Sequence, residues 1–535
     1  MKQITVKKDS YYDSVFLMLA ARGVKGLPGV KDAVVAMATP MNLELLGDMG
    51  FDPAPLAGLS PNDLVVAVDA ADAKALEAAT AEAIASLTRK KQATGDGGPP
   101  SAGSLAAALK LGAGSNMAVI SVPGAYAVRE TRKALEAGLH VMLFSDNVPL
   151  EDEVALKKLA VSRGLLLMGP DCGTAIINGK PLCFANVVRR GPIGIVAAAG
   201  TGLQEVSCLI DRYGSGVSQA IGTGGRDLKN PAVGGMTSLL AIEALAADPA
   251  TKVILVVSKP PAPAVADKVI AALRASGKPA VAHFLGLAVL ADEARLAYAT
   301  DLEEAALIAS LFAEGEPDAR SARARIVEDS GNDRYNRPNR ARIQELARRE
   351  SRPLAQEQRY LRGLYTGGTL TDEALFLAHG ALGGVRSNNH TDPAWTMADP
   401  RVSVGHAIVD LGDDVFTAGK PHPMIDPAAR AERIEREGAD PSVAALLLDV
   451  VLGYGSHPDP AGAMVEAIRG ARSAAKARGG YLPVIASVTG TPADPQGLEG
   501  QKAKLEAEGV VIMPSNYRAA LLALEIAMIA QGGRK

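Results

Sequence analysis

Short apolar runs rich in valine and isoleucine alternate with amphipathic, alanine-rich segments along most of the chain. Runs such as residues 116–124, 192–200 and 252–260 have the length of buried strands. The segments between them have helical spacing, as in AVRETRKALEAG at 127–138. Strands that alternate with helices are typical of parallel sheets with helical crossovers. The pattern therefore predicts an α/β protein.

Breaks in this pattern predict the domain boundaries. A Gly/Pro/Ser-rich stretch at 91–103 and a charged, arginine-rich stretch at 316–358 lack periodic apolar positions and are interpreted as linkers, the second with a helix or two. An RNA-binding arm is the less favoured interpretation of 316–358, because acidic residues and few aromatics accompany its arginines. The predicted domains are a small α/β or α+β domain at 1–90, a Rossmann-like unit at 104–188, and two further α/β domains at 189–315 and 359–535.

Composition and charge argue against nucleic-acid-binding, membrane-spanning and exported proteins. The 535 residues are too many for one core, and a net charge of -3 suggests neither a nucleic-acid partner nor an anionic membrane. The longest apolar runs are shorter than the roughly 20 residues needed to cross a bilayer. The first residues carry no export signal. The three cysteines have no metal-ligand or disulfide spacing, so we predict no metal site and a reducing, cytoplasmic location.

Two glycine turns are candidate phosphate sites. The run 194–210 breaks at Gly200, Thr201 and Gly202 and resumes with helical spacing, and Gly367, Gly368 and Thr369 follow a second strand in the same way. The first amides of a helix have no intrahelical partner, so with the helix dipole they attract anions. The simpler alternative is that glycine only permits the tight connection. The matched pair, with a third glycine turn at 222–228, favours anion binding. A P-loop and a dinucleotide fingerprint are both absent from the sequence.

Two polar loops offer further candidates. DLGDDVFTAGKPHPMID at 410–426 follows a strand end and carries Asp426 and His422, and the histidine is the predicted acid or base because its ordinary pKa is near neutrality. RSNNHTDP at 386–393 offers Asn388, Asn389 and His390 as hydrogen-bonding groups. The alternatives are a proline-stiffened polar loop and a capped turn.

The strand end at 171–174 is a weaker candidate for ligand contact. Cys172 is a candidate nucleophile, but the adjacent Gly173 and Thr174 more simply suggest a close-packed turn that touches a ligand or cofactor. His283 lies inside an apolar strand pattern, where a buried structural histidine is the commoner outcome.

Several of these stretches resemble known enzymes. GPDCGTAIING, GPIGIVAAAGTGLQEVSCLI and KPAVAHFLG are similar, in this order, to the α subunit of succinyl-CoA synthetase. HAIVDLGDD, ALLLDVVLGYG and LPVIASVTGTPADPQG resemble the carboxyl-terminal domain of its β subunit. Over nearly the whole chain the sequence resembles the FdrA family, which is labelled acyl-CoA synthetase-like. The resemblance implies a CoA-binding-type Rossmann domain and two flavodoxin-like domains.

Two departures from succinyl-CoA synthetase limit the chemistry that the resemblance implies. That enzyme relays phosphate through a histidine after the Lys-Pro strand, whereas here the strand runs into GLAVLADEARLAYATDLEEA, which has no histidine. The glutamate that would hold the phosphohistidine is replaced by Ser258, Lys259 and Pro260. There is also no room for an ATP-grasp domain, so we expect neither a phosphohistidine nor ATP binding of that kind.

The resemblance to FdrA implies a subunit of an oxamate carbamoyltransferase of purine-ureide catabolism. In that reaction oxalurate and phosphate give oxamate and carbamoyl phosphate, which are the expected small-molecule ligands, with CoA as a further candidate. The glycine turns would hold phosphate, and Asn388, His422 and Asp426 would contact or polarise the carbamoyl substrate. Companion subunits are expected. The alternatives are an ADP-forming acyl-CoA synthetase and a regulatory subunit that binds CoA or a phosphorylated metabolite.

Overall fold

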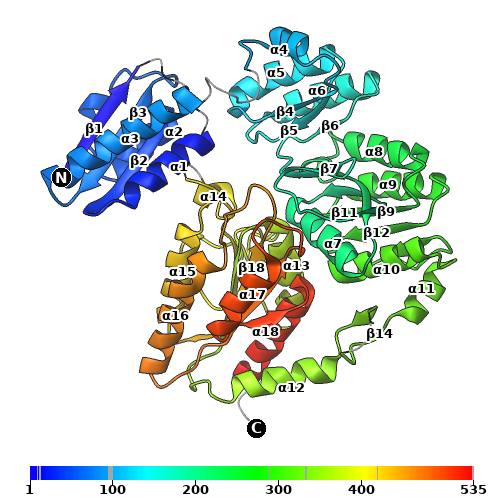
Figure 1. The fold of residues 1–535 in the computed structure, drawn as a ribbon. Helices are drawn as coiled ribbons and strands as arrows, with labels where there is room; N and C mark the ends of the chain where they lie inside the picture. Colours follow the sequence, from blue (N-terminus) through cyan, green and yellow to red (C-terminus); the bar gives the residue numbers. More distant parts are fainter. Residues whose placement is uncertain are drawn as a thin grey trace. The chain divides into compact units, whose positions relative to one another are not determined.

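The computed structural model describes residues 1–8, 10, 12, 14–93, 101–287, 290–331, 334–417 and 420–532. Part of the predicted linker 91–103, residues 94–100, therefore lies outside the described residues. The chain divides into two compact units, residues 1–114 with 414–421, and residues 115–413 with 422–535 (Figure 1). None of the described helices is both long and apolar enough to span a bilayer.

The first unit is built on a three-stranded antiparallel sheet in the order β1-β3-β2. Val66 and Val68 of β3 join one apolar cluster, whereas Val65 and Ala67 join another, so this central strand is buried on both faces. The antiparallel pairing makes the domain α+β. Its elements are β1 (Lys2–Lys7), α1 (Ser14–Lys25), β2 (Val30–Met37), α2 (Pro40–Asp48), η1 (Ala54–Leu56), β3 (Leu64–Ala70) and α3 (Ala73–Ala93), and after the linker α4 (Leu105–Leu111).

The second unit begins with a small parallel sheet in the order β4-β5-β6. Its strands alternate with helices, as the pattern of apolar runs predicts. The elements are β4 (Met117–Ile120), α5 (Gly124–Glu136), β5 (His140–Leu143), α6 (Leu150–Ser162) and β6 (Leu167–Met168).

A seven-stranded sheet follows in the order β13-β12-β11-β9-β10-β7-β8. Strands β9 to β13 are parallel and have the flavodoxin-like order, whereas β7 and β8 form an antiparallel hairpin at one edge. Helices α8 and α9 cover one face, and α7 and α10 cover the other (Figure 1). The elements are β7 (Thr174–Ile177), β8 (Lys180–Cys183), β9 (Arg190–Ala198), α7 (Gly200–Arg212), β10 (Val217–Gly222), α8 (Met236–Ala247), β11 (Val253–Ser258), α9 (Pro263–Ala275), β12 (Ala280–Phe284), β13 (Leu296–Tyr298) and α10 (Leu302–Glu314).

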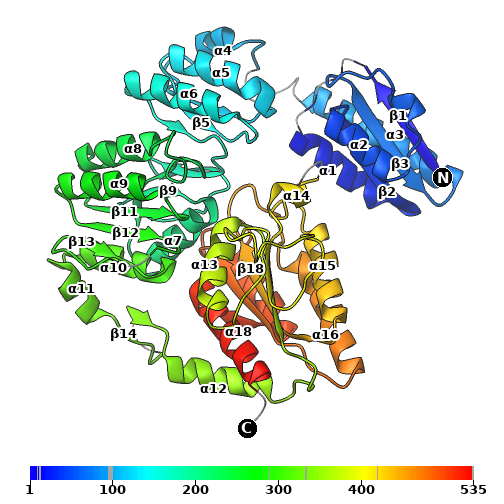
Figure 2. The same cartoon turned by 180° about the vertical axis from the view of Figure 1, so that it is seen from behind.

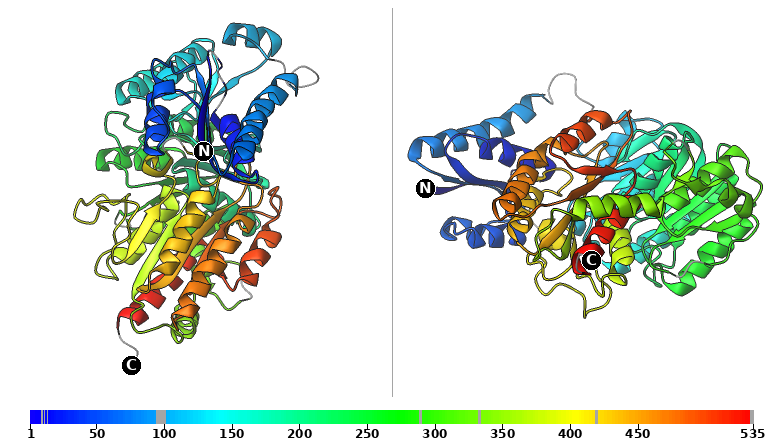
Figure 3. Two further views of the ribbon diagram at one scale, coloured as in Figure 1. Left: turned by 90° about the vertical axis from the view of Figure 1, so that its left-hand side faces the viewer. Right: turned by 90° about the horizontal axis from the view of Figure 1, so that it is seen from below.

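The last sheet is parallel and repeats the same strand order, β17-β16-β18-β19-β20. Helices α15 and α16 pack side by side on one face, and α13 and α18 lie on the other (Figure 3). The elements are β16 (Tyr360–Tyr365), α13 (Gly368–His379), β17 (Ala407–Asp410), α15 (Ala428–Ala439), β18 (Val443–Val451), α16 (Gly462–Ala477), β19 (Val484–Thr489), α17 (Leu498–Ala507), β20 (Val511–Met513) and α18 (Asn516–Gln531). The short helix α14 (Asp414–Thr417), between β17 and α15 in the chain, belongs to the first unit. The fold class is thus the predicted one.

The charged segment 316–358 contains regular structure. It includes α11 (Ala319–Arg325), the short paired strands β14 (Val327–Glu328) and β15 (Asn336–Arg337), and α12 (Arg340–Ser351). Helix α12 packs against α18, and its residues Ile343 and Ala347 are buried (Figure 2). This segment is therefore attached to the last domain through an apolar face of α12.

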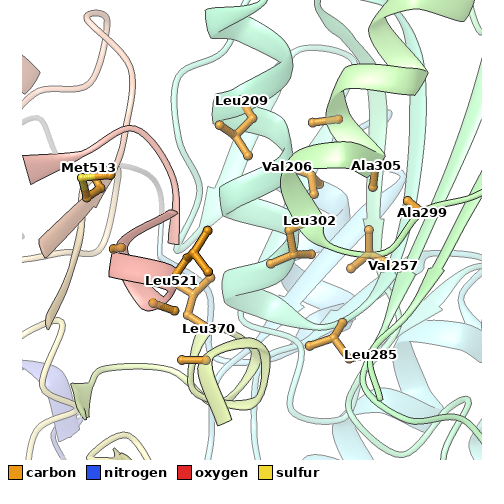
Figure 4. Packing of buried hydrophobic residues seen from close by; sticks show 14 of the residues in the cluster. Val206, Leu209, Val257, Leu285, Ala299, Leu302, Ala305, Leu370, Met513 and Leu521 are labelled. Carbon is orange, nitrogen blue, oxygen red and sulfur yellow. The ribbon is translucent and has the colours of Figure 1, made fainter. Parts of the chain in front are cut away.

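The two flavodoxin-like domains share one apolar cluster. Val206 of α7, Leu302 of α10, Leu370 of α13 and Leu521 of α18 all belong to it, and Figure 4 shows the helices meeting there. Helices α7 and α13 each begin directly after the first parallel strand of their own sheet, β9 and β16. The shared cluster holds these two helices against one another, which places both glycine turns in the same region.

A reciprocal pair of glutamates reinforces this contact. Glu205 of α7 accepts a hydrogen bond from the backbone N–H of Asn516, the first residue of α18, at 3.0 Å. Glu373 of α13 accepts one from the backbone N–H of Leu302, the first residue of α10, at 2.9 Å. Each glutamate therefore satisfies a free amide at the start of the other domain's last helix. Each domain thus supplies a glutamate that binds the first amide of the other domain's last helix.

Candidate functional site

The two predicted glycine turns lie at helix N-termini. Helix α7 begins at Gly200 after the N-cap Ala199, and α13 begins at Gly368 after the N-cap Gly367. Neither N-cap makes a side-chain hydrogen bond to the first amides of its helix. Unpaired first-turn amides with the helix dipole behind them can bind an anion. Both turns thus keep the feature on which the phosphate prediction depends.

The threonines of the two turns interlock with the glycines of the opposite turn. The Thr369 methyl lies 2.7 Å from where a Cβ on Gly202 would stand, which leaves no room for a side chain there. A Cβ on Gly367 would overlap the Thr201 side chain in the same way. Thr201 and Thr369 are both buried. Glycine at positions 202 and 367 is therefore explained by the packing of the two helix starts.

The start of α13 carries a charged cluster that we name the Lys259 cluster: Lys259, Asp372, Asp410 and Asn389. Lys259 Nζ lies 3.3 Å from Asp372 Oδ2, and Asn389 donates a hydrogen bond to Asp410 Oδ2 at 3.1 Å. A Cβ on Gly368 would overlap Lys259 Nζ and would stand 2.8 Å from Asp410 Oδ2. The ammonium group therefore lies directly at the amide end of the helix.

Burial and charge shift the pKa values of this cluster. Burial raises the pKa of Asp410 to about 6, against the opposing effect of the Lys259 ammonium. Burial also raises the pKa of Asp372. For Lys259, burial acts to lower the pKa, but the Asp372 and Asp410 carboxylates outweigh it and the pKa is raised. Lys259 thus stays a cation, while Asp410 can exchange a proton near neutral pH.

His422 lies close to the same cluster but in a fixed protonation state. Its ring packs at 5.8 Å from that of Phe184, and burial lowers its pKa to about 4. Its Nδ1 accepts a hydrogen bond from the backbone N–H of Met424 at 3.2 Å. The neutral ring therefore carries its proton on Nε2, which faces Gly412 beside Asp410. In this state His422 can donate a hydrogen bond to a carbonyl oxygen but has no free lone pair to act as a base.

The other two predicted catalytic residues have structural hydrogen bonds. The Asn388 amide pairs with both backbone groups of Asp410, donating at 2.9 Å and accepting at 3.0 Å. Asp426 accepts from the backbone N–H of Ala428 at the start of α15. Asn388 therefore positions Asp410, and its neighbour Asn389 is the asparagine that contacts the cluster.

The predicted turn at Gly173 and Thr174 packs closely. Thr174 is buried and its hydroxyl donates to the carbonyl of Phe184 at 2.7 Å. Its Oγ1 is also 3.8 Å from where a Cβ on Gly200 would stand, so the turn borders the α7 glycines. Burial raises the pKa of Cys172 to about 12, which leaves it protonated and unreactive at neutral pH. His283 is buried as predicted, and its Nδ1 hydrogen-bonds to the carbonyl of Ala299.

Three residues of this cluster, Lys259, Asp372 and Asp410, were not predicted as site residues from the sequence. Lys259 was considered only as part of the replacement of a glutamate. The signal was nevertheless present, because Lys259 directly follows β11, whose residues are all buried, at the carboxyl edge where ligands of such sheets bind. Within the described residues, no three His, Cys, Asp or Glu side chains are placed to hold a metal ion.

Comparison with known proteins supports a CoA-ligase-like protein. Residues 364–526 match a family described as CoA-ligase, and residues 1–102 match one described as "AllF, heavy metal-associated domain". The first 102 residues contain neither cysteine nor histidine, so they lack thiolate and imidazole ligands for a metal ion. The solved structure of the dinucleotide-forming acetyl-coenzyme A synthetase 1 of Ca. Korarchaeum cryptofilum, in complex with phosphate and ADP, is 16% identical, with a TM-score of 0.28 over 78% of this chain and 83% of that one.

Two relatives extend the comparison. The α subunit of ADP-forming succinate–CoA ligase from Aquifex aeolicus (strain VF5) is 32% identical over 152 residues, which are 27% of this chain and 48% of that one. The chain thus matches about half the length of that relative. "Uncharacterized protein YahF" of Escherichia coli (strain K12) is 44% identical over 527 residues, 98% of each chain. The protein therefore belongs to the same family as YahF, and it is CoA-ligase-like.

Proposed function

We propose that this chain transfers an acyl or carbamoyl group to or from phosphate at the Lys259 cluster. The observation that carries the proposal is the position of Lys259 Nζ at the amide end of α13, over Gly368. A cation and free helix amides together favour a phosphate or carboxylate oxygen. His422 adds a neutral donor for a carbonyl oxygen, and Asp410 adds a carboxyl group with a pKa of about 6.

The first form of this function is phosphorolysis of a carbamoyl substrate such as oxalurate. A phosphate oxygen held at α13 attacks the carbamoyl carbon, and the charge that develops on the carbonyl oxygen is met by the His422 Nε2–H. The bond between the carbamoyl carbon and the nitrogen of the oxamate leaving group then breaks. Asp410 passes a proton to the leaving nitrogen, and carbamoyl phosphate remains at the helix. This form needs no phosphorylated histidine, which suits the Lys259 cluster because none of its four residues is a histidine.

The second form is an ADP-forming acid–thiol ligase, which the family comparisons support more directly. Residues 364–526 match the CoA-ligase family, and the Aquifex relative is named as a succinate–CoA ligase subunit. A ligase that relays phosphate through histidine needs an accessible imidazole nitrogen with a free lone pair. His283 Nε2 has no hydrogen-bond partner among the described residues, but that side chain is only 3% exposed.

One pair of assays separates the two forms. The chain, alone and with its expected companion subunits, is incubated with oxalurate and phosphate, and carbamoyl phosphate is measured. A parallel sample receives ATP labelled in its γ-phosphate, CoA and a carboxylic acid. Carbamoyl phosphate without protein labelling supports the first form. The second form is supported if the chain acquires an acid-labile, base-stable label and the variant His283→Asn does not. Phosphate or CoA binding with neither activity in the complete complex would favour a regulatory subunit.

A further inference from the structure

A second cationic surface lies away from the Lys259 cluster. It is a groove of about 640 Å³ between α12, the turn at Met513 and Pro514, and the start of α18. Ligand sites commonly have volumes of this order. Among the described residues, the groove is lined by five arginines, Arg342, Arg348, Arg349, Arg352 and Arg518, and by two acidic residues, Asp329 and Glu345.

Part of this positive charge is already neutralised. Arg518 is buried and bonds Glu303 and Asp329, so it forms the fixed base of the groove. Arg342 lies 3.6 Å from Asp329, and Arg349 pairs with Glu350.

Arg348 and Arg352 differ from these three. In the part of the chain that the structure describes, neither forms an ion pair with an acidic side chain, and both are exposed. Arg348 lies in the last turn of α12 and Arg352, four residues later, is its C-cap residue with helical backbone angles, so their side chains lie on neighbouring turns of one face. The groove thus presents two cations that the protein does not neutralise.

Apart from Asn339, the rest of the described wall is apolar and aliphatic. Ile343, Leu346 and Met513 line the groove beside the arginines. This combination suits a ligand with an anionic head and a flat, weakly polar body. Single-stranded nucleic acid is less well matched, because it needs a positively charged groove that follows several successive phosphates, whereas Arg348 and Arg352 are the only described lining arginines that form no ion pair.

We infer that this groove binds a nucleoside di- or triphosphate. Arg348 and Arg352 hold the phosphates, and the base lies against Ile343, Leu346 and Met513. The site is separate from the Lys259 cluster and does not depend on the function proposed there.

Calorimetric titration with ADP tests the inference. ADP is expected to bind the wild-type chain, and the double variant Arg348→Gln/Arg352→Gln is expected to weaken binding by about tenfold or more, because each charge-assisted contact is strong. The matched control is Arg132→Gln/Arg320→Gln, which removes two exposed helical arginines outside the groove. Thermal unfolding of both double variants checks that the fold is retained.

Adenosine, tripolyphosphate and a single-stranded oligonucleotide complete the test. The inference predicts weak binding of adenosine alone and weaker binding of tripolyphosphate than of ATP. It is overturned if ADP does not bind at millimolar concentration, if Arg348→Gln/Arg352→Gln binds ADP like the control, or if tripolyphosphate binds as tightly as ATP. Tighter binding of the oligonucleotide than of ATP would also overturn it and would assign the groove to nucleic acid.

Discussion

The starts of α7 and α13 have the same local design but different surroundings. Each follows the first parallel strand of a flavodoxin-like sheet, contains glycine and threonine, and lacks a side-chain cap. At α13, Lys259, Asp410 and Asn389 converge on Gly368. At α7, the atom nearest to a Cβ on Gly200 would be the Thr174 hydroxyl, 3.8 Å away. Among the described residues, charged side chains therefore lie against the glycine that begins α13 but not against the one that begins α7.

This difference separates two reasons for glycine at a helix start. Gly202 and Gly367 are required because a threonine of the opposite turn occupies the space of their missing side chains. Gly368 instead leaves room for the Lys259 ammonium and the Asp410 carboxylate to approach the backbone. A glycine-rich turn at a sheet edge therefore indicates close approach, but the approaching group can be protein rather than ligand. The charges that distinguish a binding site come from other segments.

The largest expected effect is that of Lys259→Met on turnover. The substitution removes the cation at the amide end of α13, and loss of such a preorganised electrostatic contact costs roughly 10²- to 10³-fold in rate. Lys252→Met is the matched control, because that lysine directly precedes the same strand, β11, and is exposed. Steady-state kinetics with phosphate as the varied substrate, together with phosphate titration, measure the effect. Equal activity of the two variants would remove the Lys259 cluster from the mechanism.

A smaller effect is expected when the interlocked glycines are filled. Gly367→Ala forces a methyl group into the Thr201 side chain, and overpacking of a tight core costs about 1–3 kcal/mol. Gly200→Ala is the control in the opposite turn, where a methyl group would make only ordinary contact with Thr174. Urea unfolding of both variants measures the difference in free energy. If both variants match the wild type, then the interlocked packing does not explain these glycines.

The sequence predicted the framework of the site better than its chemistry. Apolar periodicity found the strands, and the turn residues at 200–202 and 367–369 correctly marked two helix starts. Which side chains point toward those starts depends on strand order and loop path. Asn388 and Asn389 show the limit, because adjacent residues in one loop divide between holding the Asp410 backbone and contacting its carboxylate. No local pattern distinguishes them.

The glutamate caps allow a pH test of the contact between the two halves. Burial raises the pKa of Glu373 to about 8, so the folded protein binds this proton more tightly than the unfolded chain, in which the pKa is near 4.5. Its contribution to stability is therefore fully present below about pH 4.5 and is lost as the pH rises to about 8. Glu373→Gln removes the titration and leaves a neutral acceptor for the Leu302 amide.

We therefore expect the stability of the wild type relative to Glu373→Gln to fall between pH 5 and pH 9, by about 1 kcal/mol or more. Urea unfolding of both proteins at pH 5, 7 and 9 measures this difference, and the titration of Asp410 cancels because both proteins contain it. In the wild type Asn516 Nδ2 donates to Glu373 Oε2 at 2.8 Å. Rotation of the Asn516 amide, whose Oδ1 has no hydrogen-bond partner among the described residues, presents an acceptor to the new side-chain amide. A constant difference across this range would contradict the raised pKa.

The smallest expected effect is that of Thr201→Val, which tests whether the α7 turn binds an anion at all. The Thr201 hydroxyl is buried and has no hydrogen-bond partner among the described residues, so its burial is unfavourable unless a ligand reaches it. Valine keeps the methyl group that packs against Gly367.

If the turn only packs, the variant should be as stable as the wild type, or more stable by up to about 1 kcal/mol, with unchanged phosphate affinity. If the hydroxyl is a ligand, phosphate should bind more weakly, and the stabilisation of the fold by phosphate should shrink with it. Thermal unfolding with and without phosphate distinguishes these outcomes. We expect unchanged phosphate affinity, because the charged groups that would accompany an anion lie at the start of α13.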